Sequence, residues 1–309
     1  MKELPHGRFT LRPEQKLFWS DRWLPFMAFI VPFVILAAAY AALQVFPFGN
    51  RHMLTVDLFH QYAPFFSLFR DKLLQGGSLF YAPTIGLGTN FYALFAYYLA
   101  SPINLLLLVF PANCLTEAIF SITLIKIGLS GLSFYLYLRT SFRRKGALAV
   151  AFSTFYALSG FVIAYSWNIM WLDALILLPV LLLAIVRHVR DGKWILYPVS
   201  VALLLITNYY VAFFAAIFTA LYYPILLLRY TGDRQHKKRL VKLLQTLGLT
   251  LIGVGLSAVV LYPTWKSLMI TSAAGDAFPK SVELLGRPLA YLGQLFPFLQ
   301  PTVRSGSPN

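Results

Sequence analysis

The feature that most constrains this chain is a succession of apolar segments, each about as long as a lipid bilayer is thick. A membrane-spanning helix needs about 20 mainly apolar residues. Only 12% of the residues are charged, about half of what the surface of a soluble domain carries. The sequence therefore predicts an all-α polytopic membrane protein and excludes a soluble enzyme or a disulfide-stabilised scaffold. The predicted spans, about seven in number, are Leu24–Phe46, Ala118–Leu138, Gly146–Tyr165, Leu172–Val186, Trp194–Tyr210, Val211–Leu228 and Leu243–Tyr262.

The basic residues predict how these spans are oriented. The formal net charge is +15, from 26 Lys and Arg against 11 Asp and Glu. Most of the excess falls in four segments between or before the apolar runs: 1–23, 139–145, 187–193 and 229–242. Lys and Arg near span ends favour the cytoplasm. We therefore expect a cytoplasmic N-terminal segment at 1–23, a lipid bilayer as the main partner and no nucleic acid.

The connection between the first two spans is expected to be a large outer loop, 47–117. Segments 1–23 and 139–145 are both expected in the cytoplasm, so an even number of crossings must separate them. The apolar run Ala93–Ala112 contains two prolines and is therefore predicted to be an interfacial or re-entrant helix. The transmembrane core is then 24–262. Residues 263–309 are expected to be extracellular and to begin a region that continues beyond this chain.

Acidic residues outside the cytoplasmic segments are few, and Asp57 is the first of them. If Asp57–Tyr62 is an α-helix, Asp57, His60 and Gln61 lie on one face. Such a group at a lipid boundary could hold a sugar and accept a hydroxyl proton. The alternative is that Asp57 only stabilises the start of a helix through its dipole.

Lys126 lies well inside the span Ala118–Leu138. A cation near the bilayer centre costs about 2.5–3.5 kcal/mol, so it normally faces a protein interior or a wet cavity. A lipid phosphate is one suitable partner. The alternatives are a side chain that reaches the membrane surface, or a structural pair with a carboxylate such as Glu117.

The predicted outer turns carry the remaining candidates, Asn168, Trp171, Asp173 and Asn208. Aromatic faces with polar neighbours suit sugars, although Trp is also common at any membrane interface. The spacing of His, Cys and acidic residues does not match a metal site. We therefore expect neither a metal nor another cofactor.

Several of these residues carry a resemblance to a known family. The chain from about Leu24 to Asn309 resembles the N-terminal part of the YfhO family of bacterial membrane proteins. The matching residues are Asp57-x3-Gln61-Tyr62, Pro64-Phe65, Gly76, Gly86-Leu87-Gly88-x-Asn90-Phe91, Tyr97-Tyr98-Leu99-x-Ser101-Pro102, Lys126, Trp167-Asn168, Trp171-x-Asp173 and Asn208-Tyr209-Tyr210.

The resemblance implies a GT-C-type glycosyltransferase of the Gram-positive plasma membrane, with its active site on the extracellular face. Such an enzyme moves a sugar from a polyprenyl-phosphate carrier, here undecaprenyl phosphate, to an acceptor such as lipoteichoic acid. It also implies an acidic residue in the first outer loop, the position of Asp57.

Our hypothesis assigns roles on this basis, with no metal required. Asp57 is expected to be the general base, and Lys126 to bind the donor phosphate. The residues expected to contact the sugar or the teichoic-acid-type acceptor are Gln61, Tyr62, Asn168, Trp171, Asp173 and Asn208. The alternative is a transporter or flippase for a lipid-linked sugar, which would also use an intramembrane cation and broken helices. Acidic residues collected on one side of the membrane favour the enzyme.

Overall fold

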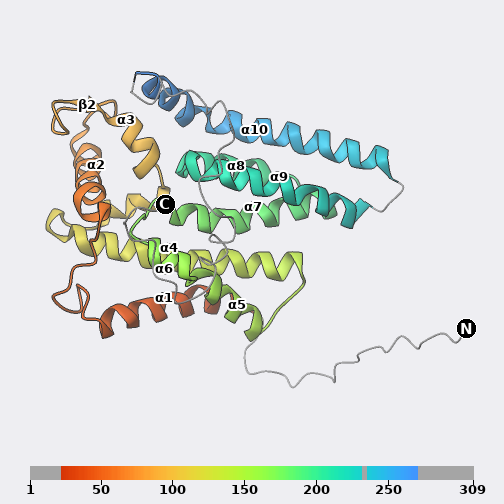
Figure 1. The fold of residues 1–309 in the computed structure, drawn as a ribbon, viewed down its shortest axis with the longest axis horizontal. Coiled ribbons are helices and arrows are strands. Elements are labelled where there is room, and N and C mark those ends of the chain that lie inside the picture. Colours follow the sequence, from red (N-terminus) through yellow and green to blue (C-terminus); the bar gives the residue numbers. More distant parts are fainter. Residues whose placement is uncertain (1–21, 232–234, 271–309) are drawn as a thin grey trace, which may run out of the picture.

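The computed structural model describes residues 22–231 and 235–270, and it is almost entirely helical (Figure 1). Six of the described helical segments are long and apolar enough to cross a membrane. This confirms the prediction of an all-α polytopic membrane protein. These six segments are Leu24–Ala42, Ala112–Ser141, Ala147–Tyr165, Leu172–Asp191, Tyr209–Thr231 and His236–Leu268.

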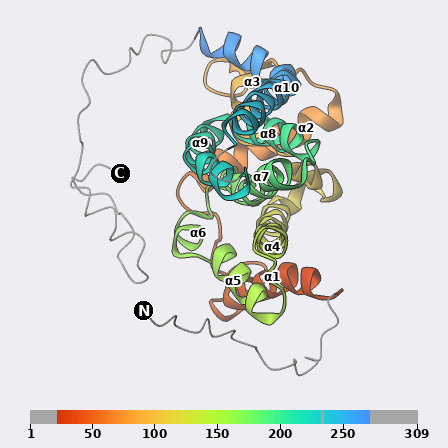
Figure 2. The same cartoon turned by 90° about the vertical axis from the view of Figure 1, so that its right-hand side faces the viewer.

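Helix α4 (Leu115–Ser141) lies at the centre of the first group of helices. It packs against α1 (Leu24–Ala42) on one side and against α7 (Leu172–Asp191) on the other, as the view in Figure 2 shows. Helix α5 (Ala147–Ala157) fills the angle between α1 and α4. More than half of the most apolar stretch of α4 is buried in the protein, so this helix is shielded from lipid by its neighbours.

A second group of helices packs on the other side of α7. Helix α8 (Leu196–Thr207) contacts both α7 and α10 (His236–Leu268), and α9 (Tyr209–Thr231) contacts α7. Between these four helices lies an apolar cavity of about 440 Å³, with polar atoms mainly from threonine and tyrosine hydroxyls. The two groups meet through α4 and α7, which carry the polar contacts described below.

The connection between α1 and α4 is folded into short elements. After an irregular stretch in which Val45 pairs with Arg51, the first helical element is a π-helix, η1 (Leu58–Tyr62), which continues into α2 (Ala63–Gln75). A two-residue antiparallel ladder follows, in which Tyr81 pairs with Asn90. The remaining elements are β1 (Tyr81–Ala82), β2 (Thr89–Asn90), α3 (Phe91–Leu94), the π-helix η2 (Phe95–Leu99), and the 3₁₀-helices η3 (Pro102–Val109) and η4 (Ala112–Cys114).

The segment predicted to be interfacial or re-entrant is sharply bent. Its two halves, Phe91–Leu99 and Pro102–Val109, meet at 98°. The bend falls at Ser101, whose backbone is extended with ψ 127°. Proline disfavours the α conformation in the residue before it, so Ser101-Pro102 separates the two helices. The segment is therefore not one straight crossing.

Two predicted spans are shorter or interrupted in the structure. The span predicted at Trp194–Tyr210 is only the 12-residue helix α8, about 18 Å long at 1.5 Å per residue, which is shorter than the bilayer core. The span Gly146–Tyr165 is broken before α6 (Gly160–Tyr165). Apolar composition predicted both runs, but composition does not show where a helix breaks.

Helix α10 extends beyond the predicted span at both ends. It begins at His236 and includes four basic residues that were assigned to a cytoplasmic loop, and it runs through Pro263 to Leu268. The predicted extracellular segment 263–309 therefore begins as helix. Its residues 271–309 lie outside the described residues, as do 1–21 of the predicted N-terminal segment.

The contact between α1 and α4 allows a direct test of helix spacing. A Cβ atom at Gly131 would lie against the backbone oxygen of Ala28 and 2.9 Å from Cγ of Pro32. Because the backbone of α1 cannot turn aside as a side chain does, Gly131→Ala should lower the free energy of unfolding by about 1–3 kcal/mol. Thermal unfolding in detergent measures this.

The matched control is Gly255→Ala in α10, where a Cβ atom meets no atom within 4 Å. Alanine is a better helix former than glycine, so this variant should be as stable as the parent or more stable, by up to about 1 kcal/mol. Equal melting temperatures for the two variants would show that α1 and α4 are not in such close contact.

Candidate functional site

A buried ion pair joins the two groups of helices. Lys126, in the middle of α4, is 0% exposed, and its Nζ lies 2.6 Å from Oδ2 of Asp173. The same ammonium group donates to the backbone oxygen of Ile169 at 3.1 Å. Asp173 lies in the first turn of α7, where the helix dipole favours a carboxylate. The carboxylate partner of Lys126 is thus Asp173, whereas the sequence suggested Glu117 as an example of such a partner.

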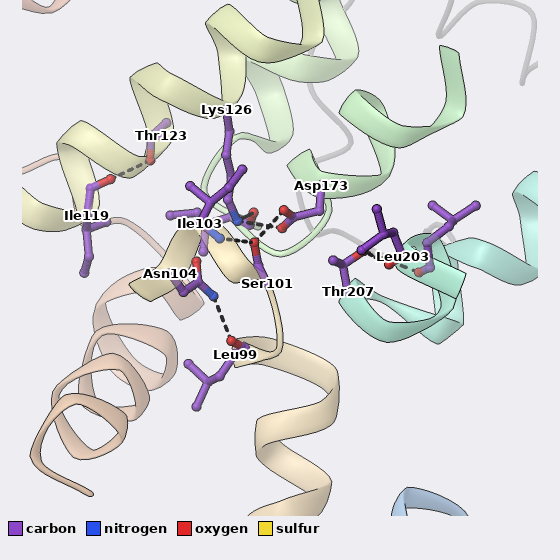
Figure 3. A network of polar contacts seen from close by, with 12 residues as sticks. Leu99, Ser101, Ile103, Asn104, Ile119, Thr123, Lys126, Asp173, Leu203 and Thr207 are labelled. Atoms are coloured by element: carbon purple, nitrogen blue, oxygen red, sulfur yellow. Dashed lines mark hydrogen bonds and ion pairs between the residues drawn. The ribbon is translucent and has the colours of Figure 1, made fainter. Parts of the chain in front are cut away.

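Ser101 extends this pair to the bent outer segment. Its hydroxyl donates to Oδ1 of Asp173 at 2.6 Å and accepts a bond from the backbone N–H of Ile103 at 3.3 Å (Figure 3). Asp173 therefore binds α4 with one oxygen and the segment between η2 and η3 with the other. Ser101 was noted in the sequence only as part of the Ser101-Pro102 motif. Nothing in the sequence indicated its partner.

Asp57 immediately precedes η1, which is a π-helix, whereas the predicted face of Asp57, His60 and Gln61 assumed an α-helix. In this π-helix the N–H of Ala63 bonds to the oxygen of Leu58, five residues earlier, so the α-helical spacing assumed for the predicted face does not apply to this segment. His60 is exposed and its ring contacts Phe59. The charge of Asp57 acts on the phenol of Tyr62, five residues on.

The Tyr62 hydroxyl is the best-defined polar group next to Asp57. It donates to Oδ1 of Asn168 at 3.0 Å. Burial raises the pKa of Tyr62, and the negative charge of Asp57 raises this pKa further. The phenol therefore stays protonated and remains a hydrogen-bond donor. Asp57 also acts electrostatically on Tyr98.

Aromatic side chains from four parts of the chain form a continuous row beside Asp57. The ring of Tyr62 lies 6.3 Å from that of Trp167 and 5.1 Å from that of Tyr98. Tyr98 lies 4.6 Å from Tyr97, whose ring in turn lies 5.9 Å from that of Tyr209 at the start of α9. We call Trp167, Tyr62, Tyr98, Tyr97 and Tyr209 the aromatic row. The roles of Tyr97, Tyr98 and Tyr209 were not assigned from sequence, because tyrosines are frequent at any membrane interface.

Three of the predicted ligand residues present N–H groups to the interior. Asn168 and Asn208 are almost fully buried, and the Nδ2 atoms of both, like Nε1 of Trp171, have no hydrogen-bond partner among the described residues. The other end of Asn208 caps α9 by accepting from the N–H of Val211 at 2.8 Å. Buried N–H groups are normally paired, with protein, water or a ligand. The three therefore suit an oxygen-bearing partner.

The site thus consists of two clusters. Asp57, Tyr62 and Asn168 belong to the first, and Lys126 and Asp173 to the second. They are joined by the short segment 168–173, because Asn168 and Ile169 are consecutive residues with one partner in each cluster. Gln61 is half-buried beside Tyr62 in η1. Within 22–231 and 235–270, no group of three or more His, Cys, Asp or Glu side chains lies close enough to hold a metal ion.

Comparison with known proteins gives one match. Residues 27–308 match the model of a family described as bacterial membrane protein YfhO. No curated protein matches the chain. No solved structure matches it either.

Proposed function

The chain belongs to the YfhO family of bacterial membrane proteins, and we propose that it is a membrane glycosyltransferase. The donor is a polyprenyl-phosphate-linked sugar, and the acceptor is an extracellular hydroxyl-rich polymer such as lipoteichoic acid. The observation that carries the proposal is the position of Asp57, a carboxylate at the start of η1 in the connection between α1 and α4 whose charge acts on the phenols of Tyr62 and Tyr98. The family assignment and the multi-pass fold support a role at the membrane.

In this proposal Asp57 is the general base. Its carboxylate accepts the proton of the acceptor hydroxyl as the oxygen attacks the anomeric carbon of the donor sugar. The bond between that carbon and the carrier phosphate breaks, and the phosphate leaves with the electron pair. The aromatic row orients the reacting groups, and the neutral Tyr62 donates a hydrogen bond without competing for the proton.

The buried N–H groups of Asn168, Trp171 and Asn208 are proposed to bind oxygen atoms of the sugar or of the phosphate. The predicted role of Lys126 as phosphate ligand is less favoured by the geometry, because its ammonium group already donates to Asp173 and Ile169. We propose that Lys126 and Asp173 position the segment 168–173 and the bent outer segment.

The charge distribution supports an extracellular active site. If the basic segments 139–145 and 187–193 are cytoplasmic, the connection that carries Asp57 and the turn that carries Asn168 lie on the opposite side. We propose that the protein resides in the bacterial plasma membrane with a cytoplasmic N-terminus and this site outside.

A transporter or flippase for the same lipid is the second candidate. The 98° bend between Phe91–Leu99 and Pro102–Val109 favours it, since broken helices are common at transport sites. The described spans, however, bury a single Lys–Asp pair whose charges cancel. A transport path needs polar groups through the membrane, so the enzyme is the better fit.

Reconstitution in liposomes separates the two functions. Donor lipid is placed in the outer leaflet, and a soluble teichoic-type acceptor is added outside. We expect glycosylated acceptor without movement of donor to the inner leaflet, as measured by mass spectrometry and by protection of the donor from an impermeant reagent. Protein-free liposomes are the control, and donor movement without product would replace the enzyme proposal with the transporter.

A further inference from the structure

A second cavity shares Trp167 with the aromatic row. Its volume is about 270 Å³, and it is enclosed by the end of α1, the segment 45–58, α4 and α6 with the turn that follows it. Leu58 and Thr123 form its floor and are each 1% exposed. His52 and Thr55 are exposed and form its rim. The cavity is therefore a pocket that opens toward the polar side of the outer connection.

The lining of this cavity is rich in hydroxyl groups and, among the described residues that form it, lacks fixed charge. Tyr40, Thr55, Thr123 and Ser166 contribute hydroxyls, and His52 contributes the imidazole. The Thr123 hydroxyl donates to the backbone oxygen of Ile119 at 2.9 Å, so toward the cavity its oxygen can only accept. Such a lining suits a neutral ligand with hydroxyl groups and disfavours a free phosphate.

Trp167 gives the cavity an aromatic wall. The face of an aromatic ring carries partial negative charge and attracts polarised C–H groups, which are present on the apolar faces of a sugar ring. The volume falls just below the range of about 300–1,000 Å³ typical of sites for drug-sized ligands. The cavity can therefore hold one ring but not an oligosaccharide.

The opening also borders the lipid-facing surface. Ile163 lines the cavity and is 52% exposed, on a helix that belongs to the candidate span Ala147–Tyr165. A ligand that enters between this residue and the polar rim must be polar at one end and apolar at the other. We propose that this cavity binds the sugar headgroup of a glycolipid, separately from the acid–base site at Asp57.

The proposal is tested by photolabelling with an octyl glucoside that carries a diazirine on its sugar ring, on the purified full chain in detergent. We expect labelling to concentrate in 52–55 and 163–167, located by peptide mass spectrometry. Excess unlabelled octyl glucoside should suppress it, and an octyl zwitterion should not. Labelling spread over other segments, or equally suppressed by the zwitterion, would overturn the proposal.

Variants that fill the cavity provide the matched comparison. Ala164→Trp should lower labelling about tenfold, equivalent to about 1.4 kcal/mol of binding free energy, because Ala164 lines the cavity. Thr55→Trp, at the rim, should also lower labelling. This variant replaces Ala164→Trp in the test if Ala164→Trp does not fold. Ala258→Trp makes the same change as Ala164→Trp on the exposed surface of α10 and should leave labelling unchanged. Undiminished labelling in a folded Ala164→Trp or Thr55→Trp protein would also overturn the proposal.

The assignment of a sugar headgroup to this cavity does not depend on the proposed function, and only the source of that headgroup rests on it. The sugar can belong to the donor or to a glycolipid anchor of the acceptor. Competition with polyprenyl-phosphate-sugar identifies the first source, and competition with diglucosyl diacylglycerol the second. Asp57→Asn should retain full labelling. If the parent protein is labelled in the cavity but shows no transferase activity, the proposed function is rejected and the cavity assignment stands.

Discussion

Replacing Asp57 by asparagine is expected to reduce sugar transfer by about 10²–10⁴-fold, the usual contribution of a general base. The amide has the shape of the carboxylate but cannot accept the acceptor proton. The loss should appear in kcat, with the KM values for donor and acceptor changed much less, because the side chain acts on the proton and not on the remainder of either substrate. The assay is transfer in reconstituted liposomes at matched protein amounts.

Asp71→Asn is the control for this variant. Asp71 lies in α2 within the same connection, is 47% exposed and is 3.7 Å from Arg70. A carboxylate that is this exposed and this far from its partner contributes little, and Arg70 keeps its hydrogen bonds to the backbone oxygen of Phe110, so this variant should retain parental activity and stability. Parental transfer rates in a folded Asp57→Asn protein would remove the base assignment.

The second large effect concerns stability. Lys126→Met should lower the free energy of unfolding by about 3–5 kcal/mol, because it leaves the buried carboxylate of Asp173 without its counter-charge. Adding Asp173→Leu should recover most of this loss, since a buried pair replaced by apolar side chains is often neutral for stability. Thermal unfolding of the three proteins in detergent measures the coupling between the two positions.

The control is Lys237→Met, at an exposed position in the first turn of α10, which should melt like the parent. If the Lys126→Met protein also melts at the temperature of the parent, the ion pair does not stabilise the fold.

The double variant also decides whether Lys126 binds the donor phosphate. If the pair only positions its neighbours, the folded Lys126→Met, Asp173→Leu protein should have a nearly parental KM for donor lipid. A KM raised about tenfold or more in that protein, with parental unfolding, would instead support the phosphate role.

The sequence predicted the membrane class and most of the spans for a physical reason. The bilayer core selects segments by apolar length and requires the backbone to satisfy its own hydrogen bonds. Both properties are local, so α1, α4, α7 and α9 could be placed within a few residues. The prolines likewise indicated that Ala93–Ala112 is not an ordinary span, and the structure bends that segment by 98°.

Local helix geometry was less predictable. Asp57 was placed correctly as an acid at the start of a helical segment, but that segment is the π-helix η1 and not the α-helix on which the predicted face depended. A π-helical turn has almost the same composition as an α-helical one, so the sequence did not distinguish them. The short helix α8 and the break before α6 were missed for a similar reason.

The sequence by itself determined that this chain is a multi-pass helical membrane protein, and which few polar residues are candidates for a functional site. Only the tertiary structure decided their partners: Lys126 pairs with Asp173, 47 residues away, and Tyr62 with Asn168, 106 residues away. Lipid-compatible helices are apolar around most of their circumference, so composition says little about which face turns inward. The rotation of each helix about its own axis is set by side-chain packing between helices, as at Gly131. This packing brings the outer connection into contact with α4 and α7.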